Sequence, residues 1–301
     1  MTVLLGIDAG GTKTVAAVTD GTRELARASG AAGAVRPGRA MAAAGTIATV
    51  ARRALAQAGL LRADIMVVGA AGVGREEERQ ALRDALRIET LAEQLIVTTD
   101  IEIALQSAFG KDPGIVLLAG TGSFAVGHLP DGGIVRQGGH GWQMGDDGSA
   151  YALGRAALVA ASRGHDGRAP ATSLEAALMR ATRARDFNDL VRWSVVAGPP
   201  EVAALAPVVL DAAAAGDPVA LSLRDDAVAD LVAQVAALLP RFSGMTEAVP
   251  VALAGGLLER EGLRAPVTAA LRALPRLVLH EALLDPVQGA LALAATERGQ
   301  A

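Results

Sequence analysis

The sequence contains no cysteine, which excludes disulfides, thiolate-bound metals and iron–sulfur clusters held by cysteine. Aromatic residues make up only 2% of the chain, so the stacking platforms that single-strand nucleic-acid binders use are missing. A net charge of −4 leaves no basic stripe for nucleic acid. The four histidines, His128, His140, His165 and His280, lack the spacing of metal ligands.

Long hydrophobic runs are also missing. The apolar stretch 203–215 is interrupted by Pro207 and Asp211, and no stretch reaches the length of a membrane span. No charged leader precedes the first apolar run, so we expect no signal peptide. We therefore expect a cytoplasmic protein without membrane or nucleic-acid partners. Its 301 residues are enough for two domains.

The sequence does contain two glycine-rich turns, each at the end of a buried-strand pattern. The first is Gly10-Gly11-Thr12-Lys13-Thr14, and the second is Gly120-Thr121-Gly122-Ser123. Glycine lets the backbone approach a ligand closely, and consecutive N–H groups in such turns converge on anions. One such turn in each half of the chain predicts two domains that close on one polyphosphate.

Two better-known phosphate loops fit these turns poorly. The first turn is not a Walker A loop, because Thr12 separates Gly11 from Lys13. The second turn matches a dinucleotide fingerprint, which requires a helix to follow. Because a strand pattern follows at 123–129, we do not expect a dinucleotide site.

Two aspartates stand at predicted strand ends. Asp8 either starts a hairpin turn or faces the phosphate loop, where a carboxylate needs a divalent cation such as Mg²⁺ between itself and phosphate. Asp100 follows the strand pattern 95–99 and is either a helix N-cap or a general base that accepts a proton from an attacking hydroxyl.

Two further segments suggest ligand contacts. Residues 138–149 are dense in glycine and polar residues, and Asp146 is expected to accept hydrogen bonds from substrate hydroxyls. The alternative is an ordinary helix start, which favours carboxylates. Trp142 either contacts substrate or packs. Gly255-Gly256 is either a tight turn between strand and helix or a bare surface for adenine and ribose.

The two halves share one predicted order of elements, which indicates an internal duplication. The first half has strands at 3–8, 14–20, 23–29, 65–70 and 95–99 with helices at 39–59, 75–87 and 101–109. The second has strands at 115–119, 123–129, 133–137, 249–254 and 276–280 with helices within 148–241 and at 258–273 and 286–297. This order predicts two α/β domains with a cleft between them.

Taken in order, these segments resemble the sugar-kinase, Hsp70 and actin superfamily, and more closely its N-acetylglucosamine kinase branch, the BadF/BadG-type ATPases. The resemblance rests on Asp8–Thr14, Thr98–Asp100, Ala119–Ser123, Gly145–Ser149, Ala254–Gly256 and Pro286–Ala290. It implies two ribonuclease H-like (actin-like ATPase) domains, comprising residues 1–110 plus 286–301 and residues 111–285, with an interdomain cleft.

The resemblance also implies a function, an ATP-dependent amino-sugar kinase that phosphorylates O6 of N-acetylglucosamine. In this function, Asp8 would hold Mg²⁺, and Asp100 would be the catalytic base. We expect a homodimer that takes a sugar and ATP. The implied ATP-binding residues are Gly10, Gly11, Thr12, Lys13, Thr14, Gly120, Thr121, Gly122, Ser123, Gly255 and Gly256. The implied sugar-binding residues are Asp100, Gly122, Gly141, Trp142, Asp146 and Ser149.

Two departures from the family pattern leave the sugar open. Ala34 stands where the family usually has an Asn that holds the hexose, and Gly139-His140-Gly141-Trp142 stands where Gly-Gly-Trp-Gly is common. Glucosamine and N-acetylmuramic acid are therefore alternative substrates, and a non-catalytic sensor of ATP and sugar is an alternative function. Related dehydratase activators hold an iron–sulfur cluster through cysteines, which this chain lacks.

Overall fold

The computed structural model describes residues 2–280 and 284–298. The chain forms two compact units, residues 1–112 with 284–301 and residues 113–283. The sequence predicted the domain boundaries after residue 110 and before residue 286. Residues 281–283 and 299–301 of the expected domains lie outside the described residues. Each unit is built around a five-stranded sheet.

The first unit has the strand order β3-β2-β1-β4-β5. Its strands are β1 (Leu4–Ala9), β2 (Thr14–Thr19), β3 (Glu24–Gly30), β4 (Ala63–Ala70) and β5 (Ala92–Thr99). The first three strands are antiparallel, whereas β1, β4 and β5 run parallel. The parallel strands β1 and β4 are nearly continuous apolar runs because helices cover both of their faces.

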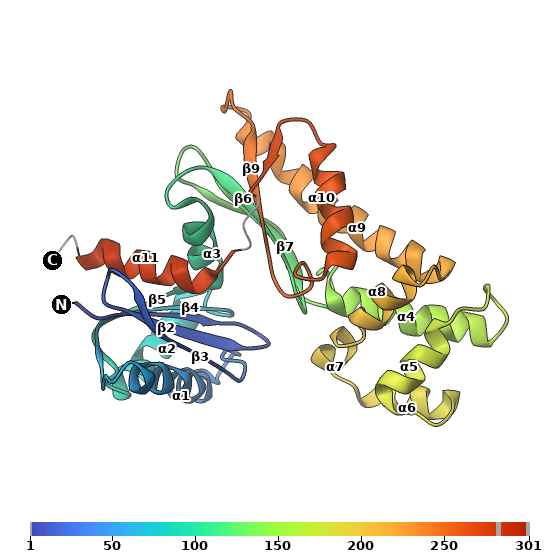
Figure 1. Cartoon of the computed structure of the whole chain (residues 1–301), viewed down its shortest axis with the longest axis horizontal. Coiled ribbons are helices and arrows are strands. Elements are labelled where there is room, and N and C mark those ends of the chain that lie inside the picture. Colours follow the sequence, from blue (N-terminus) through green and yellow to red (C-terminus); the bar gives the residue numbers. More distant parts are fainter. Residues whose placement is uncertain (1, 281–283, 299–301) are drawn as a thin grey trace. The chain divides into compact units, whose positions relative to one another are not determined.

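Four helices cover this sheet (Figure 1). Helices α1 (Ala40–Gln57) and α2 (Glu76–Ile88) share one hydrophobic core with one face of the sheet. Helices α3 (Asp100–Phe109) and α11 (Pro286–Arg298) share a smaller core with the opposite face.

Strand alternation decides which face each residue of β1 takes. Leu5 and Ile7 face the larger core, whereas Leu4 lies in the core under α3 and α11. A Cβ at Gly6 would come within 2.8 Å of the Leu291 side chain, so α11 packs directly on this strand. Asp8 continues the series Leu4, Gly6, and it therefore lies on the α3 and α11 side at the end of the strand.

The second unit repeats this sheet in the order β10-β9-β6-β7-β8. Its strands are β6 (Gly114–Ala119), β7 (Ser123–His128), β8 (Ile134–Gly138), β9 (Val249–Ala254) and β10 (Leu277–Leu279). Again three strands are antiparallel, and the first of them pairs in parallel with β9, which pairs in parallel with β10. The duplication expected from the sequence is therefore present in the sheet topology.

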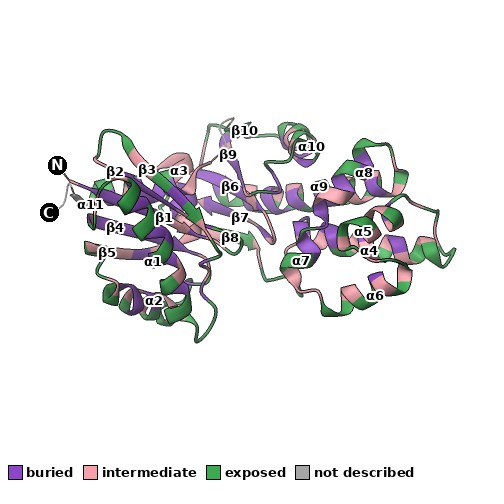
Figure 2. Ribbon diagram, turned by 60° about the horizontal axis from the view of Figure 1, so that its bottom comes forward, coloured by how far each residue is buried: buried purple, intermediate pink, exposed green. Residues whose placement is uncertain are grey.

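Where the first unit has α1 alone between its third and fourth strands, the second unit has a helical insertion. The insertion consists of α4 (Ala150–His165), α5 (Leu174–Thr182), α6 (Phe187–Val196), α7 (Pro199–Ala203), α8 (Ala206–Ala214), α9 (Pro218–Leu238) and the 3₁₀ helix η1 (Leu239–Phe242). Together with α10 (Glu261–Arg272), these helices share one core with the sheet. Figure 2 shows buried central strands in both sheets, whereas the edge strands β3 and β8 consist mostly of exposed and intermediate positions.

The predicted order of strands and helices is confirmed, but two elements begin three residues away from the predicted positions. Strand β5 begins at Ala92 rather than at 95. Helix α10 begins at Glu261 rather than at 258, because the Leu257 N–H bonds to the Ala119 carbonyl (3.1 Å) and the Leu258 N–H bonds to the Gly255 carbonyl (2.9 Å). Among the described residues, no single helix is long and apolar enough to cross a membrane. A pair of segments bent by 119°, 199–214 and 218–242, passes that test by length and composition only.

Candidate functional site

The carboxyl ends of β1 and β5 bring Asp8 and Asp100 to one edge of the first unit's sheet. Helix α3 begins there with a capping box, in which the Glu102 N–H donates to Thr99 Oγ1 (3.1 Å) and the Thr99 N–H donates to Glu102 Oε2 (2.9 Å). The alternative that Asp100 is the N-cap is therefore wrong, since Thr99 is the cap. Asp100 is the first helical residue, and its Oδ1 accepts from the Ile101 N–H (3.0 Å).

Asp8 experiences an unusual electrostatic environment. Burial raises its pKa to about 6, repulsion from Asp100 and Asp285 adds to the rise, and the Lys13 ammonium opposes it. A half-buried carboxylate that is repelled by two others would be stabilised by a divalent cation, and oxygen ligands are those that Mg²⁺ prefers. The donor chemistry at this edge therefore fits Mg²⁺. Among the described residues, no three His, Cys, Asp or Glu side chains are gathered closely enough to hold a metal unaided.

The first glycine turn exposes its backbone beside Asp8. The Gly10 N–H donates to the Lys13 carbonyl (3.0 Å) and closes the turn, while Gly11, Thr12 and Lys13 are exposed. A Cβ at Gly11 would meet no atom within 4 Å. The Ala34 N–H donates to the Gly10 carbonyl (3.2 Å), which places the position of the family's usual Asn directly against this turn.

Thr14 was predicted to bind ATP, but the structure places its side chain in the interior. The residue is fully buried, and its hydroxyl donates to the Ala31 carbonyl (2.8 Å). This hydroxyl therefore holds the segment after β3 in place and points into the protein.

The second glycine turn is joined to the start of α4. The Gly120 N–H donates to the Gly122 carbonyl (2.8 Å) within the turn. The Ala150 N–H donates to the Gly120 carbonyl (2.9 Å) and the Tyr151 N–H donates to the Thr121 carbonyl (3.2 Å). The predicted phosphate turn and the predicted sugar loop of this unit are thus one connected structure.

Asp146 lies against this turn. Its backbone is left-handed (φ 57°), and its Oδ1 accepts from the Gly141 N–H (3.3 Å). A Cβ at Gly122 would come within 2.7 Å of Asp146 Oδ2, so only glycine leaves the carboxylate this position. Burial raises the pKa of Asp146, and the Gly141 N–H opposes the rise.

Two serines predicted to bind ligand are buried and hydrogen bonded within the protein. The Ser123 hydroxyl donates to the Asp147 carbonyl (2.6 Å), and Ser149 caps α4 by accepting from the Ala152 N–H (3.1 Å). Their side chains hold the loop to the turn and the helix.

Trp142 and Gly141 lie in the exposed part of the same loop. The Trp142 side chain is 46% exposed, and its ring lies 5.3 Å from the Tyr151 ring. Gly141 has a φ of +91°, which favours glycine. Trp142 therefore packs on one side and leaves surface available on the other.

The Gly255-Gly256 turn adjoins the end of β6. A Cβ at Gly255 (φ +97°) would collide with the Ala119 carbonyl oxygen, which explains the need for glycine there. A Cβ at Gly256 would meet nothing within 4 Å. The turn thus has one packed glycine and one bare glycine.

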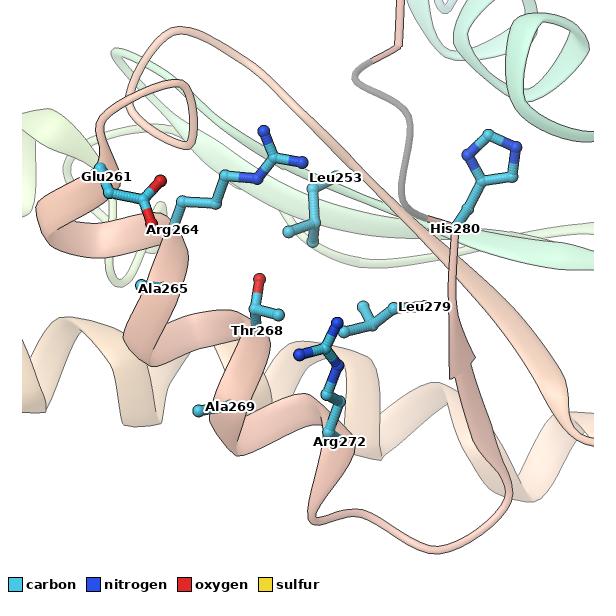
Figure 3. A pocket seen from close by; sticks show the side chains of 9 residues that line it. All are labelled: Leu253, Glu261, Arg264, Ala265, Thr268, Ala269, Arg272, Leu279 and His280. Atoms are coloured by element: carbon cyan, nitrogen blue, oxygen red, sulfur yellow. The ribbon is translucent and has the colours of Figure 1, made fainter.

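A groove of about 390 Å³ that was not predicted from the sequence lies along α10, the helix that follows this turn in the chain (Figure 3). Its lining comprises Leu253, Glu261, Arg264, Ala265, Thr268, Ala269, Arg272, Leu279 and His280. Arg264, Thr268 and Arg272 point the same way from the helix because they are spaced by four residues. That spacing is the signal in the sequence that could have found them.

Gln234 on α9 was not predicted from the sequence either. It is one of four buried polar residues in the described part of the chain, and the other three are Thr14, Ser123 and Ser149. A lone glutamine in the apolar run 231–239 was the available signal. Its amide contacts Ser123 and Asp147, so all four buried polar residues support the predicted ligand turns.

Curated relatives of this chain are sugar kinases. An N-acetylmuramic acid/N-acetylglucosamine kinase of Clostridium acetobutylicum is 32% identical over 193 residues, which are 64% of this chain and 63% of the relative, just under two thirds of its length. An N-acetyl-D-glucosamine kinase of Dictyostelium discoideum is 27% identical over 236 residues, which are 75% of this chain and 74% of that relative.

Whole-chain similarity comes from a solved structure and from a protein family. A candidate N-acetylglucosamine kinase from Chromobacterium violaceum superposes with a TM-score of 0.82 at 32% identity, over 98% of this chain and 99% of that one. The BadF/BadG/BcrA/BcrD ATPase family matches residues 5–294. Since the match spans both units, the chain belongs to the BadF/BadG/BcrA/BcrD ATPase family.

Proposed function

We propose that this protein is an ATP-dependent kinase that transfers a phosphoryl group to an amino sugar, with O6 of N-acetylglucosamine as the acceptor. The observation that carries the proposal is the pair of carboxylates, Asp8 and Asp100, at the strand ends beside an open glycine turn. The curated relatives with sugar-kinase names support the same reaction class.

In this proposal, both glycine turns donate backbone N–H groups to phosphate oxygens, and Lys13 adds positive charge. Asp8 would hold Mg²⁺, which neutralises phosphate charge as the bond to the transferred group breaks. The groove along α10 would take the adenosine end, since Leu253 and Leu279 offer apolar walls and guanidinium groups stack on aromatic rings.

Asp100 would orient the sugar hydroxyl and accept its proton while the oxygen bonds to the γ-phosphorus and ADP leaves. The capping box at Thr99 fixes the backbone of this residue, so the carboxylate is held on a rigid element. Asp146 would accept hydrogen bonds from other sugar hydroxyls, with Gly141 and Trp142 as further contacts. Because phosphoryl transfer has a loose transition state, positioning and charge supply most of the rate enhancement.

The direct test is ADP release from ATP·Mg²⁺ with N-acetylglucosamine, glucosamine, N-acetylmuramic acid and glucose, each compared with no sugar. Asp100→Asn runs alongside as the test of the base, and Asp84→Asn on the exposed side of α2 is the matched control. Release with one amino sugar that is lost only in Asp100→Asn supports the kinase. ATP binding without sugar-dependent release would instead favour the sensor.

Two finer expectations stay predictions. The homodimer expected from the sequence is checked by light scattering during gel filtration, and the cytoplasmic location by fractionation of cells that express the protein.

A further inference from the structure

Gln234 occupies a position on α9 that the core would ordinarily fill with an apolar side chain. Its neighbours along the buried face, Leu231, Val235 and Leu238, all pack into the core of the second unit. Only 7% of Gln234 is exposed. A buried amide destabilises a fold unless its polar atoms are hydrogen bonded, so its partners indicate what it does.

The amide nitrogen of Gln234 joins two predicted ligand segments. Nε2 donates to the Asp147 carbonyl (2.9 Å) and to Ser123 Oγ (3.3 Å), while the Ser123 hydroxyl itself donates to the same carbonyl. A carbonyl oxygen only accepts, so the nitrogen and not the oxygen of the amide must face it. The glutamine thus links Ser123, the residue that ends the phosphate turn, to Asp147, the residue that follows Asp146.

The amide oxygen of Gln234 has no hydrogen-bond partner within residues 2–280 and 284–298, although it is buried. It lies 3.0 Å from the point that a Cβ on Gly138 would occupy, at the start of the loop that ends at Ser149. An orphaned buried acceptor is unfavourable, and a backbone N–H from the loop would satisfy it. The side chain therefore hydrogen bonds to the end of the predicted sugar loop, and its free oxygen lies near the start of that loop.

We propose that Gln234 is a positioning residue that sets the sugar loop against the phosphate turn, and that its free oxygen accepts a loop N–H when sugar is bound. The inference rests on the proposed kinase function, because the loop carries Asp146. Gln234 itself touches no substrate. It acts through Asp147, whose carbonyl fixes the loop, and through Ser123, which follows Gly122.

The test compares Gln234→Met, which keeps the length of the side chain and removes both polar atoms, with Val235→Ala. The control lies next to it on α9, is fully buried, and contacts neither turn nor loop in the hydrogen bonds described.

We expect Gln234→Met to raise the KM for sugar and lower kcat, together by about 10- to 100-fold in kcat/KM. The KM for ATP should change less than about threefold, since the backbone of the turn remains. Val235→Ala should lower Tm and leave kcat/KM unchanged.

Amide hydrogen exchange provides a readout that does not need turnover. In Gln234→Met, peptides covering 120–124 and 138–149 should exchange faster than in wild type, whereas Val235→Ala should affect α9 instead. A double variant with Ser123→Ala should be no worse than the poorer single variant, because both changes loosen the same carbonyl.

The outcomes separate this inference from the proposed function. Wild-type protein that phosphorylates no sugar contradicts the function, and the exchange measurement still decides whether Gln234 holds the loop. An active wild type with Gln234→Met kinetics that match it, or with losses that follow Tm as in Val235→Ala, overturns the inference alone. Unchanged exchange in both segments also overturns it.

Discussion

The first hairpins of the two units, β1–β2 and β6–β7, have the same burial pattern at every strand position. Each hairpin has an alanine before the turn and a buried hydroxyl residue after it, Thr14 in one and Ser123 in the other. In both, that hydroxyl donates to the backbone of the segment that follows the third strand. The duplicated part of the fold is thus preserved down to single hydrogen bonds.

The two units differ in the side chains that stand at equivalent strand ends, although the backbone around these positions is the same. The half-buried position before the last residue of the strand is Asp8 in β1 and Leu118 in β6. The fifth strand of each unit in chain order leads into Asp100 in the first unit, after β5, and into His280 in the second, after β10. The first unit therefore carries the acidic groups, while the second adds a long glycine loop with Asp146. Duplication has supplied one frame, and the two units differ in the side chains that they carry at a few strand ends.

The largest expected effect follows from this division. Asp100→Asn should lower sugar-dependent ADP release by about 1,000-fold or more, because the amide cannot accept the hydroxyl proton. The capping box formed by Thr99 and Glu102 remains, so Tm should stay within a few degrees of wild type. Steady-state kinetics with a coupled ADP assay and a thermal melt check both parts. Activity near that of Asp84→Asn would remove Asp100 from the mechanism and contradict a catalytic role for the end of β5.

Asp8→Asn should reduce activity by about 100-fold and yet stabilise the fold at high pH. Because the pKa of Asp8 in the fold is about 6 instead of 3.8, the native state disfavours the charged form. This penalty is absent below pH 3.8, grows as pH rises and is complete above about pH 6. Removing it should add about 1–3 kcal/mol to the free energy of unfolding at pH 8 and less at pH 5.

The first measurement for Asp8→Asn is the difference in unfolding free energy from wild type at pH 5 and pH 8, with EDTA present. In a second measurement without EDTA, adding Mg²⁺ and ATP should stabilise wild type more than the variant, because a ligand stabilises only the state that binds it. A variant that is less stable than wild type at pH 8, or equally stabilised by Mg²⁺ and ATP, would contradict the role of Asp8.

Three glycines sharpen the comparison between the turns. Gly122→Ala should raise the KM for sugar about tenfold, equivalent to about 1.4 kcal/mol, since the new methyl group would meet Asp146 Oδ2 at 2.7 Å. Gly11→Ala and Gly120→Ala meet no protein atom within 4 Å, so their Tm should be unchanged. If phosphates lie on these turns, both raise the KM for ATP instead. A reversed pattern of KM changes would show that the two ligands are assigned to the wrong segments.

The same residues show how far the sequence could lead. Strand patterns that end in glycine turns are local, so the hairpins, the duplication and the acidic strand ends were all predictable. The N-cap was placed at Asp100 instead of Thr99 in one alternative because both residue types cap helices well, and only the capping-box hydrogen bonds decide between them.

Other features depend on contacts between distant residues. Residue type alone cannot show that the hydroxyls of Thr14 and Ser123 point inward, because their partners belong to segments that fold back from elsewhere. Gln234 lies 111 residues from Ser123 and 87 from Asp147 along the chain. The groove likewise combines α10 with the ends of β9 and β10. None of these has a motif of its own.

The smallest effect is the one that separates the two buried hydroxyls. Thr14→Val and Ser123→Ala should each lower the free energy of unfolding by about 1–2 kcal/mol, the usual cost of losing a buried hydrogen bond. Both residues were predicted to bind ATP, yet with inward hydroxyls neither variant should change the KM for ATP more than about twofold. Only Ser123→Ala should raise the KM for sugar, by about threefold, because its hydroxyl holds the Asp147 carbonyl whereas Thr14 holds Ala31.

Urea unfolding and the two KM values measure this contrast. A tenfold rise in the KM for ATP in Thr14→Val would mean that the hydroxyl turns outward to the nucleotide, and the equivalence of the two hairpins would then end at the backbone.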